Sequence, residues 1–283
     1  MAQRLKKSLR IACLQTNAGS DWEKNLSLIR RRLRRLLRRR LERPLRYPID
    51  CVALPEMFYW RGPSSDLRRV AEESKKVVRE FRQLARQTGV AFLLGSLLTA
   101  SGKKGKFYNT SFLISEKGKI AGRYQKIHLF NIGLKGKVTA RESRHILPGK
   151  KIVTGSVSGI RCGLTVCYDL RFPELFRHLA ARGVEIIFVP ANFTYFTGQA
   201  HWETLLRARA IENQAFIVAP AQIGVHPTTG IRSFGTSLII DPWGSVLARG
   251  SRTQEETVTA RLDLAQLRSL RRSFPVLSHR RLR

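Results

Sequence analysis

The feature that most constrains the fold of this chain is the alternation of short apolar runs with amphipathic helical stretches. Residues 9–17, "LRIACLQTN", and residues 49–56, "IDCVALPE", read as buried strands, and residues 20–44 between them carry apolar side chains at helical spacing. A second unit follows, in which residues 65–89 predict a helix and residues 90–98, "VAFLLGSLL", predict another buried strand. This alternation predicts an α/β protein whose sheet is covered by helices.

The predicted helix over residues 20–44 is rich in arginine but has an ordinary amphipathic pattern. Ser20 and Glu23 form a capping-box pattern at its start, and Pro44 is expected to end it. The arginines fall mostly on the faces that the apolar residues leave free. This pattern favours a helix whose outer face is exposed to solvent over a helix that binds a membrane or RNA. The apolar residues at helical spacing are Leu26, Ile29, Leu33, Leu36, Leu37 and Leu41.

The remainder of the chain predicts hairpins and further helix–strand units in one continuous domain. With 283 residues and 43% hydrophobic content, the chain can bury a large core. No segment rich in Pro, Gly or Ser divides it, so we expect a single domain over residues 1–283. The predicted units are a hairpin at 106–124, strand pairs within 151–166 and 233–250, helix–strand units at 176–193 and 200–224, and a helix ended near Pro275 with a basic tail at about 275–283.

The charge of the chain is strongly positive. Lysine and arginine number 52 against 20 aspartate and glutamate, a formal net charge of +32, and such a field attracts nucleic acid, anionic surfaces and anionic small molecules alike. The arginines are spread over the helices and both ends, without a separate basic tail with interleaved aromatics. This distribution argues against nucleic acid as a partner, and a catalytically idle, basic nucleic-acid-binding protein on the same fold stays open as an alternative.

The cysteines and the apolar runs indicate the compartment. Four cysteines (Cys13, Cys51, Cys162 and Cys167) are too few and too scattered for a disulfide framework, so reduced thiols are expected, the first three as core residues. The apolar run "IACL" is too short for a signal peptide, and no later run approaches the roughly 18 residues of a membrane span. We therefore expect a cytoplasmic protein without a membrane segment.

Three reactive side chains follow predicted strands. Glu56 is the last residue of "ALPE", Lys126 follows the hairpin strand as the first residue of "KIHLF", and Cys167 follows "LTV". Because open α/β sheets bind ligands beyond their strand ends, these groups from distant parts of the chain can converge on one pocket. A cysteine attacks as the thiolate, a carboxylate can shuttle the proton, and an ammonium can stabilise an oxyanion. Together they predict an acyl-transfer site.

The motifs "LPEMF", "YQKIHLF" and "CGLTVCYDLRFPEL" resemble the three blocks of the nitrilase superfamily of carbon–nitrogen hydrolases, in the expected order. The blocks "GQAHWETLLRARAIENQ" and "IIDPWGSVLA" resemble the branch that contains deaminated glutathione amidase and omega-amidase. The resemblance runs from about residue 9 to about residue 280. It implies a four-layer α-β-β-α sandwich, a homodimer or higher homo-oligomer paired through the second helical layer, and no metal or cofactor.

The resemblance also implies roles for the reactive residues. Cys167 would be the nucleophile, Lys126 and the backbone N–H of Tyr168 would stabilise the oxyanion, and Glu56 would be the general base and acid. Glu142 matches a second glutamate that the family places beside the lysine; a simple salt bridge in a loop is the alternative. A histidine base is less favoured, because His128 and His201 lack a partnering pattern.

The resemblance further implies a substrate. Arg171 would face a substrate carboxylate, with an ion pair to Glu174 or Asp169 as the alternative, while Phe193 would form an apolar wall and Thr197 a polar contact. The expected reaction releases ammonia from a small carboxylate-bearing amide, such as deaminated glutathione or the omega-amide of a 2-oxo acid. This chain has "FGTS" where the branch typically reads Tyr-Gly-His-Ser, so an N-carbamoyl amidohydrolase with the same triad stays open.

Overall fold

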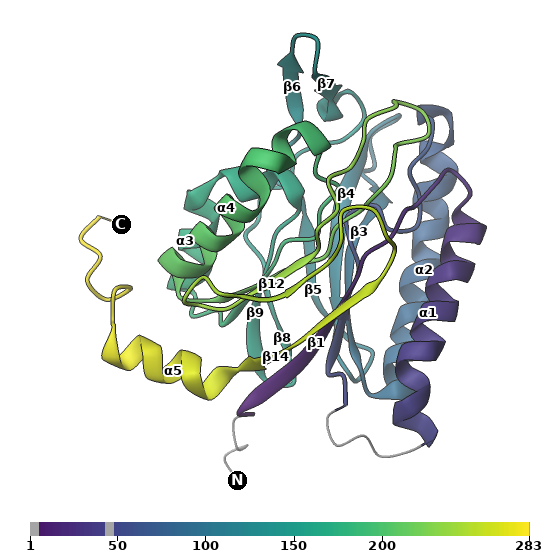
Figure 1. Ribbon diagram of the computed structural model, residues 1–283. Helices are drawn as coiled ribbons and strands as arrows, with labels where there is room; N and C mark the ends of the chain where they lie inside the picture. Colours follow the sequence, from purple (N-terminus) through teal and green to yellow (C-terminus); the bar gives the residue numbers. More distant parts are fainter. Residues whose placement is uncertain (1–5, 43–47, 283) are drawn as a thin grey trace.

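Two β-sheets lie face to face in the computed structural model, with helices on both outer faces (Figure 1). The structure describes residues 6–42 and 48–282. Helices α1 (Trp22–Glu42) and α2 (Leu67–Thr88) cover one outer face, while α3 (Pro173–Ala181) and α4 (Tyr195–Asn213) cover the other. The four layers are the predicted α-β-β-α sandwich, so the predicted fold class is confirmed.

The first sheet combines a parallel centre with antiparallel edges. Strands β1, β2 and β3 run parallel, because α1 and α2 each carry the chain back over the same face. β4 and β5 form the predicted hairpin beside β3. Across the sheet the order is β14 (Thr257–Asp263), β1 (Ser8–Leu14), β2 (Cys51–Ala53), β3 (Ala91–Ala100), β4 (Phe107–Ile114) and β5 (Ile120–Gln125).

The second sheet repeats this plan. Strands β9, β10 and β11 run parallel, with α3 and α4 as the crossovers, and hairpin strands lie on either side. The order is β13 (Val246–Arg249), β12 (Leu238–Ile240), β11 (Phe216–Ala219), β10 (Ile186–Phe188), β9 (Ile160–Leu164) and β8 (Thr154–Val157). A small hairpin, β6 (Asn131–Leu134) with β7 (Val138–Arg141), projects from the sandwich and was not predicted.

Helix α1 shows how the sequence pattern becomes a packed layer. Its apolar side chains Leu26, Ile29, Leu33 and Leu37 are buried against the first sheet, as their spacing predicts. The predicted cap is wrong by one residue, since the Asp21 carboxylate accepts the N–H of Lys24 and the helix begins at Trp22. Pro44 and the side chain of Leu41 lie outside the described residues.

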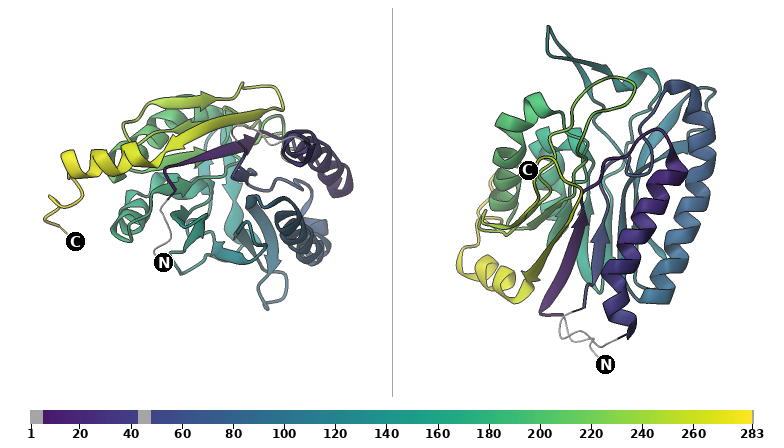
Figure 2. Two further views of the ribbon diagram at one scale, coloured as in Figure 1. Left: turned by 90° about the horizontal axis from the view of Figure 1, so that it is seen from below. Right: turned by 45° about the vertical axis from the view of Figure 1, so that its right-hand side comes forward.

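The C-terminal part of the chain returns to the N-terminal strand. β14 pairs with β1 over the whole of both strands, which the sequence did not predict because alternate β14 residues are exposed and its run is only weakly apolar. Asp263 then caps α5 (Leu264–Ser273) by accepting the N–H groups of Ala265 and Gln266. As predicted, α5 ends before Pro275; it extends beyond the sandwich on the side away from α1 and α2 (Figure 2).

In residues 6–42 and 48–282, no helix has an apolar stretch long enough for a membrane span.

Candidate active site

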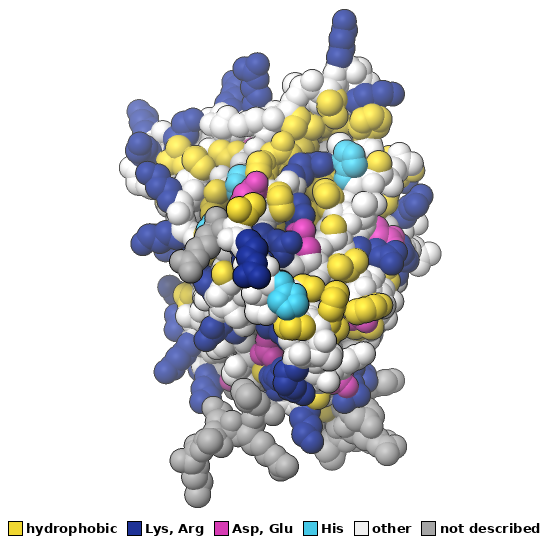
Figure 3. All heavy atoms as spheres, turned by 90° about the vertical axis from the view of Figure 1, so that its left-hand side faces the viewer, with side chains coloured by type: hydrophobic (Ala, Val, Ile, Leu, Met, Phe, Trp, Pro, Cys, Tyr) yellow, Lys and Arg dark blue, Asp and Glu magenta, His cyan; other side chains and the backbone are white. Residues whose placement is uncertain are grey.

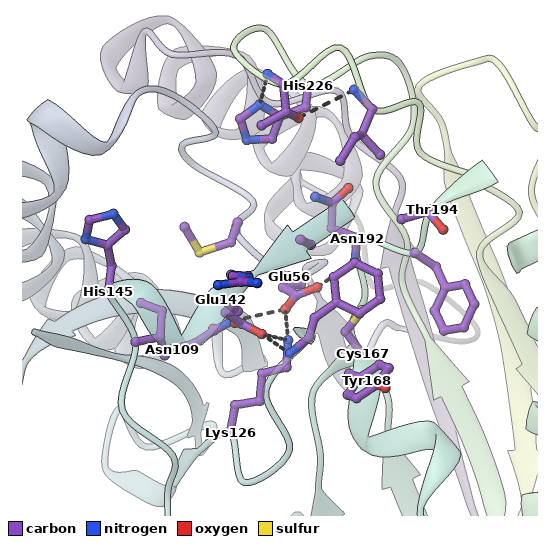
Figure 4. Close-up of a pocket in the computed structure, with 18 of the residues that line it drawn as sticks. Glu56, Asn109, Lys126, Glu142, His145, Cys167, Tyr168, Asn192, Thr194 and His226 are labelled. Atoms are coloured by element: carbon purple, nitrogen blue, oxygen red, sulfur yellow. Dashed lines mark hydrogen bonds and ion pairs between the residues drawn. The ribbon is translucent and has the colours of Figure 1, made fainter. Parts of the chain in front are cut away.

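Four of the predicted residues meet at one end of a cavity. The ammonium Nζ of Lys126 lies 3.0 Å from Glu56 Oε1 and 2.9 Å from Glu142 Oε2, and Cys167 lines the same cavity (Figure 4). Lys126 and Glu56 are only 2% and 5% exposed, so this is a buried charge cluster. The convergence predicted from three strand ends is therefore what the structure shows.

Each of these side chains follows a strand. Glu56 comes shortly after β2, and Lys126 comes directly after β5. Cys167 begins the short 3-10 helix η3 (Cys167–Arg171), which follows β9, and Glu142 begins η2 (Glu142–Arg144) after β7. Because β2 and β5 belong to one sheet and β9 to the other, the site exists only when the two sheets are packed together.

The backbone at Cys167 makes a strained turn. Its φ of +50° lies in the left-handed region, which a residue with a Cβ rarely adopts. The Cys167 N–H donates to Pro190 O at 2.9 Å and holds the turn. The strained turn presents the thiol to the cavity; Cys167 is 6% exposed, whereas Cys13, Cys51 and Cys162 are fully buried core residues, as expected.

The burial of the cluster shifts the pKa values of Lys126 and Cys167. Burial alone would lower the pKa of the Lys126 ammonium, but the charges of Glu142 and Glu56 outweigh it and raise the pKa well above its ordinary value. Burial, and next the charge of Glu56, raise the pKa of the Cys167 thiol, against the opposing effect of Lys126. Lys126 therefore stays a cation, and Cys167 is a thiol at neutral pH.

Two groups that the sequence analysis missed complete the carboxylate network. The side-chain amide of Asn109, on β4, donates to Glu56 Oε1 at 3.0 Å and to Glu142 Oε1 at 3.2 Å. The backbone N–H of Asn192 donates to the other oxygen, Glu56 Oε2, at 2.8 Å. Asn109 had a detectable signal, since asparagine is depleted in strands and this one interrupts an apolar run. A backbone donor such as Asn192 N–H leaves no sequence signal.

The buried carboxylate of Asp169 ties the lysine segment to the cysteine turn. It accepts the Tyr124 hydroxyl at 2.7 Å and the Val166 N–H at 2.8 Å, and its other oxygen lies 2.8 Å from His128 Nδ1. The partner of His128 is thus a structural carboxylate and not the Cys167 thiol. His128 stacks on Phe172, with ring centroids 3.7 Å apart, and does not line the cavity, so it is no base for Cys167.

The predicted substrate contacts also line the cavity. The Arg171 guanidinium lies over the rings of Tyr168 and Phe193, at 5.6 and 5.1 Å from their centroids. It donates to His201 Nδ1 at 3.1 Å. Thr197 is buried and its hydroxyl lies 2.8 Å from that of Thr194.

Arg171 has no acidic partner among the described residues. Neither of its alternative partners forms an ion pair with it there, because the Asp169 carboxylate is directed to other groups and Glu174 makes no such contact. A guanidinium that faces a cavity without a carboxylate is free to bind an anionic ligand.

The cavity is large relative to the reactive cluster. Its volume is about 490 Å³, within the range of sites that hold drug-sized ligands. Apolar side chains, among them Met57, Trp60, Leu67 and Ile146, line part of its wall. In the part of the chain that the structure describes, no group of three or more His, Cys, Asp or Glu residues is placed to hold a metal ion.

Known proteins share both the sequence pattern and the fold. The family described as carbon-nitrogen hydrolase matches residues 10–272. Deaminated glutathione amidase of Homo sapiens is 41% identical over 82% of this chain and 72% of its own length, and that of Yersinia enterocolitica is 36% identical over 97% and 94%. The crystal structure of the Caenorhabditis elegans NitFhit protein has a TM-score of 0.86 and 34% identity, over 98% of this chain and 66% of that longer chain. The chain therefore belongs to the carbon–nitrogen hydrolase family.

Proposed function

We propose that this protein is an amidase that hydrolyses a small carboxylate-bearing amide through a thioester on Cys167. The observation that carries this proposal is the buried Lys126 ammonium between Glu56 and Glu142, in the cavity that Cys167 lines. Such a cluster places a nucleophile, a base and a fixed positive charge around one reacting carbonyl.

In the first half of the reaction, the Cys167 sulfur attacks the amide carbon and Glu56 takes the thiol proton. The carbonyl oxygen becomes an oxyanion, which Lys126 and the Tyr168 N–H stabilise. When the carbon–nitrogen bond breaks, the amine leaves with the proton that Glu56 returns. Glu142 and Asn109 hold the lysine and the base in place during these steps.

In the second half, water replaces the amine. Glu56 accepts a proton from water, whose oxygen attacks the thioester carbon, and Lys126 again faces the oxyanion. The carbon–sulfur bond then breaks, the carboxylic acid leaves, and the proton returns to the Cys167 sulfur. The raised pKa of the Cys167 thiol favours this last step.

The substrate class follows from Arg171 and from the relatives. Arg171 would bind a carboxylate on the acyl part of the substrate, and Phe193 and Thr197 would line its sides. Deaminated glutathione, which gives the relatives their name, and omega-amides of 2-oxo acids both carry this carboxylate. An omega-amide releases ammonia, whereas deaminated glutathione releases a dipeptide amine. An N-carbamoyl amino acid is the alternative substrate.

A panel of amides tests this proposal. We expect turnover of 2-oxoglutaramate or deaminated glutathione, measured as release of 2-oxoglutarate, and loss of this turnover in Cys167→Ala. Cys162→Ala, which removes a different buried thiol, is the matched control and should keep its activity. Turnover by a correctly folded Cys167→Ala would rule out the thioester route. Preferred hydrolysis of N-carbamoyl amino acids would establish the alternative.

We further propose that two copies pair through the α3–α4 layer. On this face, apolar side chains lie exposed among the basic ones (Figure 3), and Ile211, Trp243 and Phe274 are 49%, 67% and 52% exposed. Exposed apolar groups of this size are typical of interfaces. Trp243→Glu should lower the mass measured by sedimentation to that of a monomer; an unchanged mass would contradict pairing through this face.

Three further expectations stay predictions: a cytoplasmic location, a single domain over residues 1–283 and a reaction without metal or cofactor. Nucleic-acid binding without turnover is not favoured, because the hydrogen-bonded cluster around Lys126 is complete.

A further inference from the structure

The loop over residues 225–232 places His226 at the end of the cavity away from Lys126 (Figure 4). The loop is closed on itself, since the His226 N–H donates to Ile231 O at 2.9 Å and Val225 pairs with Arg232. His226, Thr228, Thr229 and Ile231 line this end of the cavity. None of these residues has a part in the proposed steps at Cys167.

The hydrogen bonds of His226 fix which ring nitrogen carries the proton. Its Nδ1 accepts the backbone N–H groups of Thr228 and Thr229, at 3.2 and 3.3 Å. A neutral ring with an acceptor at Nδ1 must carry its hydrogen on Nε2. Burial, and then the positive charge of Arg61, lower the pKa of His226, so the ring is neutral at neutral pH. Its Nε2–H has no partner among the described residues.

Basic side chains also line the part of the cavity near Glu142, where His145 lies apart from His226 (Figure 4). Arg141 lines the cavity, is exposed, and forms no ion pair within the described part of the chain. His145 also lines it, and burial together with the charges of Arg144 and Lys106 lowers its pKa. The charges that lower the pKa values of these two histidines thus belong to cations: Arg61 for His226, and Arg144 and Lys106 for His145. A ligand oxygen, above all one with negative charge, is the complementary partner.

We propose that His226 is a specificity-determining residue, whose Nε2–H binds an oxygen of the leaving amine. The inference rests on the proposed function, in which Arg171 holds the acyl carboxylate and leaves the amine part of the substrate for the His226 end. The favoured leaving group is then a peptide-like amine with a carbonyl or carboxylate oxygen. Ammonia, which has no such oxygen, gains nothing from His226.

Three amides with one acyl group separate this role from the chemistry at Cys167. 2-Oxoglutaramate, its N-propyl amide and deaminated glutathione all form the same thioester, so hydrolysis of that thioester is an identical step for all three. The N-propyl amide adds bulk to the leaving group but no oxygen. Differences among the three therefore arise in binding or in the step that expels the amine, and the change that a variant causes for each amide reports on recognition of the amine.

Two substitutions of His226 separate the donor from the loop geometry. In His226→Asn, the side-chain oxygen can still accept the N–H groups of Thr228 and Thr229, but the donor at the position of Nε2 is lost. In His226→Gln, the longer side chain brings an amide N–H back towards that position. The first variant therefore tests the hydrogen bond, and the second tests its rescue.

We expect His226→Asn to raise KM for deaminated glutathione by about 10- to 100-fold, the size of one hydrogen bond to a polar or charged partner, with kcat changed little. The two other amides should be unaffected, and His226→Gln should restore most of the loss. A change below about threefold, or equal losses for all three amides, would overturn the inference. If the native enzyme hydrolyses none of them, the proposed function itself fails.

The native enzyme provides a test that does not depend on the folding of a variant. Its KM for deaminated glutathione should be lower than that for the N-propyl amide, because only the former offers an oxygen to Nε2. Equal KM values for these two amides would also overturn the role of His226.

Discussion

Two buried cations near the active site, Lys126 and Arg61, have the same burial but opposite surroundings. They are 2% and 1% exposed. Lys126 lies between two carboxylates, and its pKa is raised. Arg61 forms no ion pair within the described residues, and burial lowers its pKa to about 10. Removal of a cation from water costs free energy in both cases. The charges of two carboxylates offset this cost at Lys126, and the dipoles of neutral oxygens offset it at Arg61.

The guanidinium of Arg61 is satisfied by neutral oxygens from separate loops. Its five hydrogen bonds have lengths of 2.7–3.3 Å and join the loop after β1 to the loops after β10 and β11. Asn192 is one of these partners, and its N–H holds Glu56. Arg61 therefore positions loops, whereas Lys126 would supply charge to the proposed reaction. The acceptors are Asn17 Oδ1, Ala18 O, Asn192 Oδ1, Ile223 O and Ser233 Oγ.

Removal of Lys126 should have the largest effect on both activity and stability. We expect Lys126→Met to lower kcat by at least about 10³-fold through loss of the oxyanion charge, and to destabilise the fold by about 3–5 kcal/mol because the buried Glu56 and the partly buried Glu142 lose their partner. Amide turnover and urea unfolding measure the two effects. The double variant with Glu142→Gln should recover part of the stability but no activity. Activity within tenfold of native would contradict the role of Lys126.

Substitution of Arg61 should lower the free energy of unfolding more than it lowers kcat. Arg61→Lys keeps the charge but cannot reach all five oxygens, so we expect a loss of about 2–3 kcal/mol in the free energy of unfolding. The value of kcat should change by less than about tenfold, or 1.4 kcal/mol. Arg68→Lys, on the exposed side of α2, is the control. A larger loss of kcat than of stability would place Arg61 in the chemistry.

A substitution at Asn109 sharpens the comparison without removal of a charge. Asn109→Ala deletes the two donors that fix Glu56 and Glu142, while the Lys126 ammonium stays. We expect a loss of about 1–2 kcal/mol in transition-state stabilisation, which is about a tenfold lower kcat. Asn109→Ser, which keeps a hydroxyl donor, should lose less. An unchanged kcat in the Ala variant would show that Lys126 alone orders the carboxylates.

The exposed Arg30 should contribute least to the free energy of unfolding among the cations compared. Arg30 forms a two-point contact with Glu80, at 2.7 Å for both bonds, but both side chains are more than one third exposed. Arg30→Ala should therefore cost less than about 1 kcal/mol in urea unfolding, and the cost should shrink further in high salt. A loss of unfolding free energy as large as that of Arg61→Lys would mean that the hydrogen-bond partners of a cation, and not its burial, determine its contribution to stability.

Prediction from the sequence succeeded where the signal is local. The apolar spacing in α1 and α2, and the helix end before Pro275, follow from neighbouring residues. The pairing of β14 with β1 joins the two ends of the chain, and no local pattern specifies it. The β6–β7 hairpin was missed because its short strands are largely exposed and lack an apolar face.

The residues of the active site could be predicted from the sequence, but their contacts could not. The order of strands and helices, and the three motifs that carry Glu56, Lys126 and Cys167, are properties of the sequence alone. Only the packing of the two sheets decides that Lys126 lies between Glu56 and Glu142, and that a backbone N–H from Asn192 holds the Glu56 carboxylate. Hydrogen bonds form only within about 3 Å, and such distances between remote residues exist only after the chain has folded.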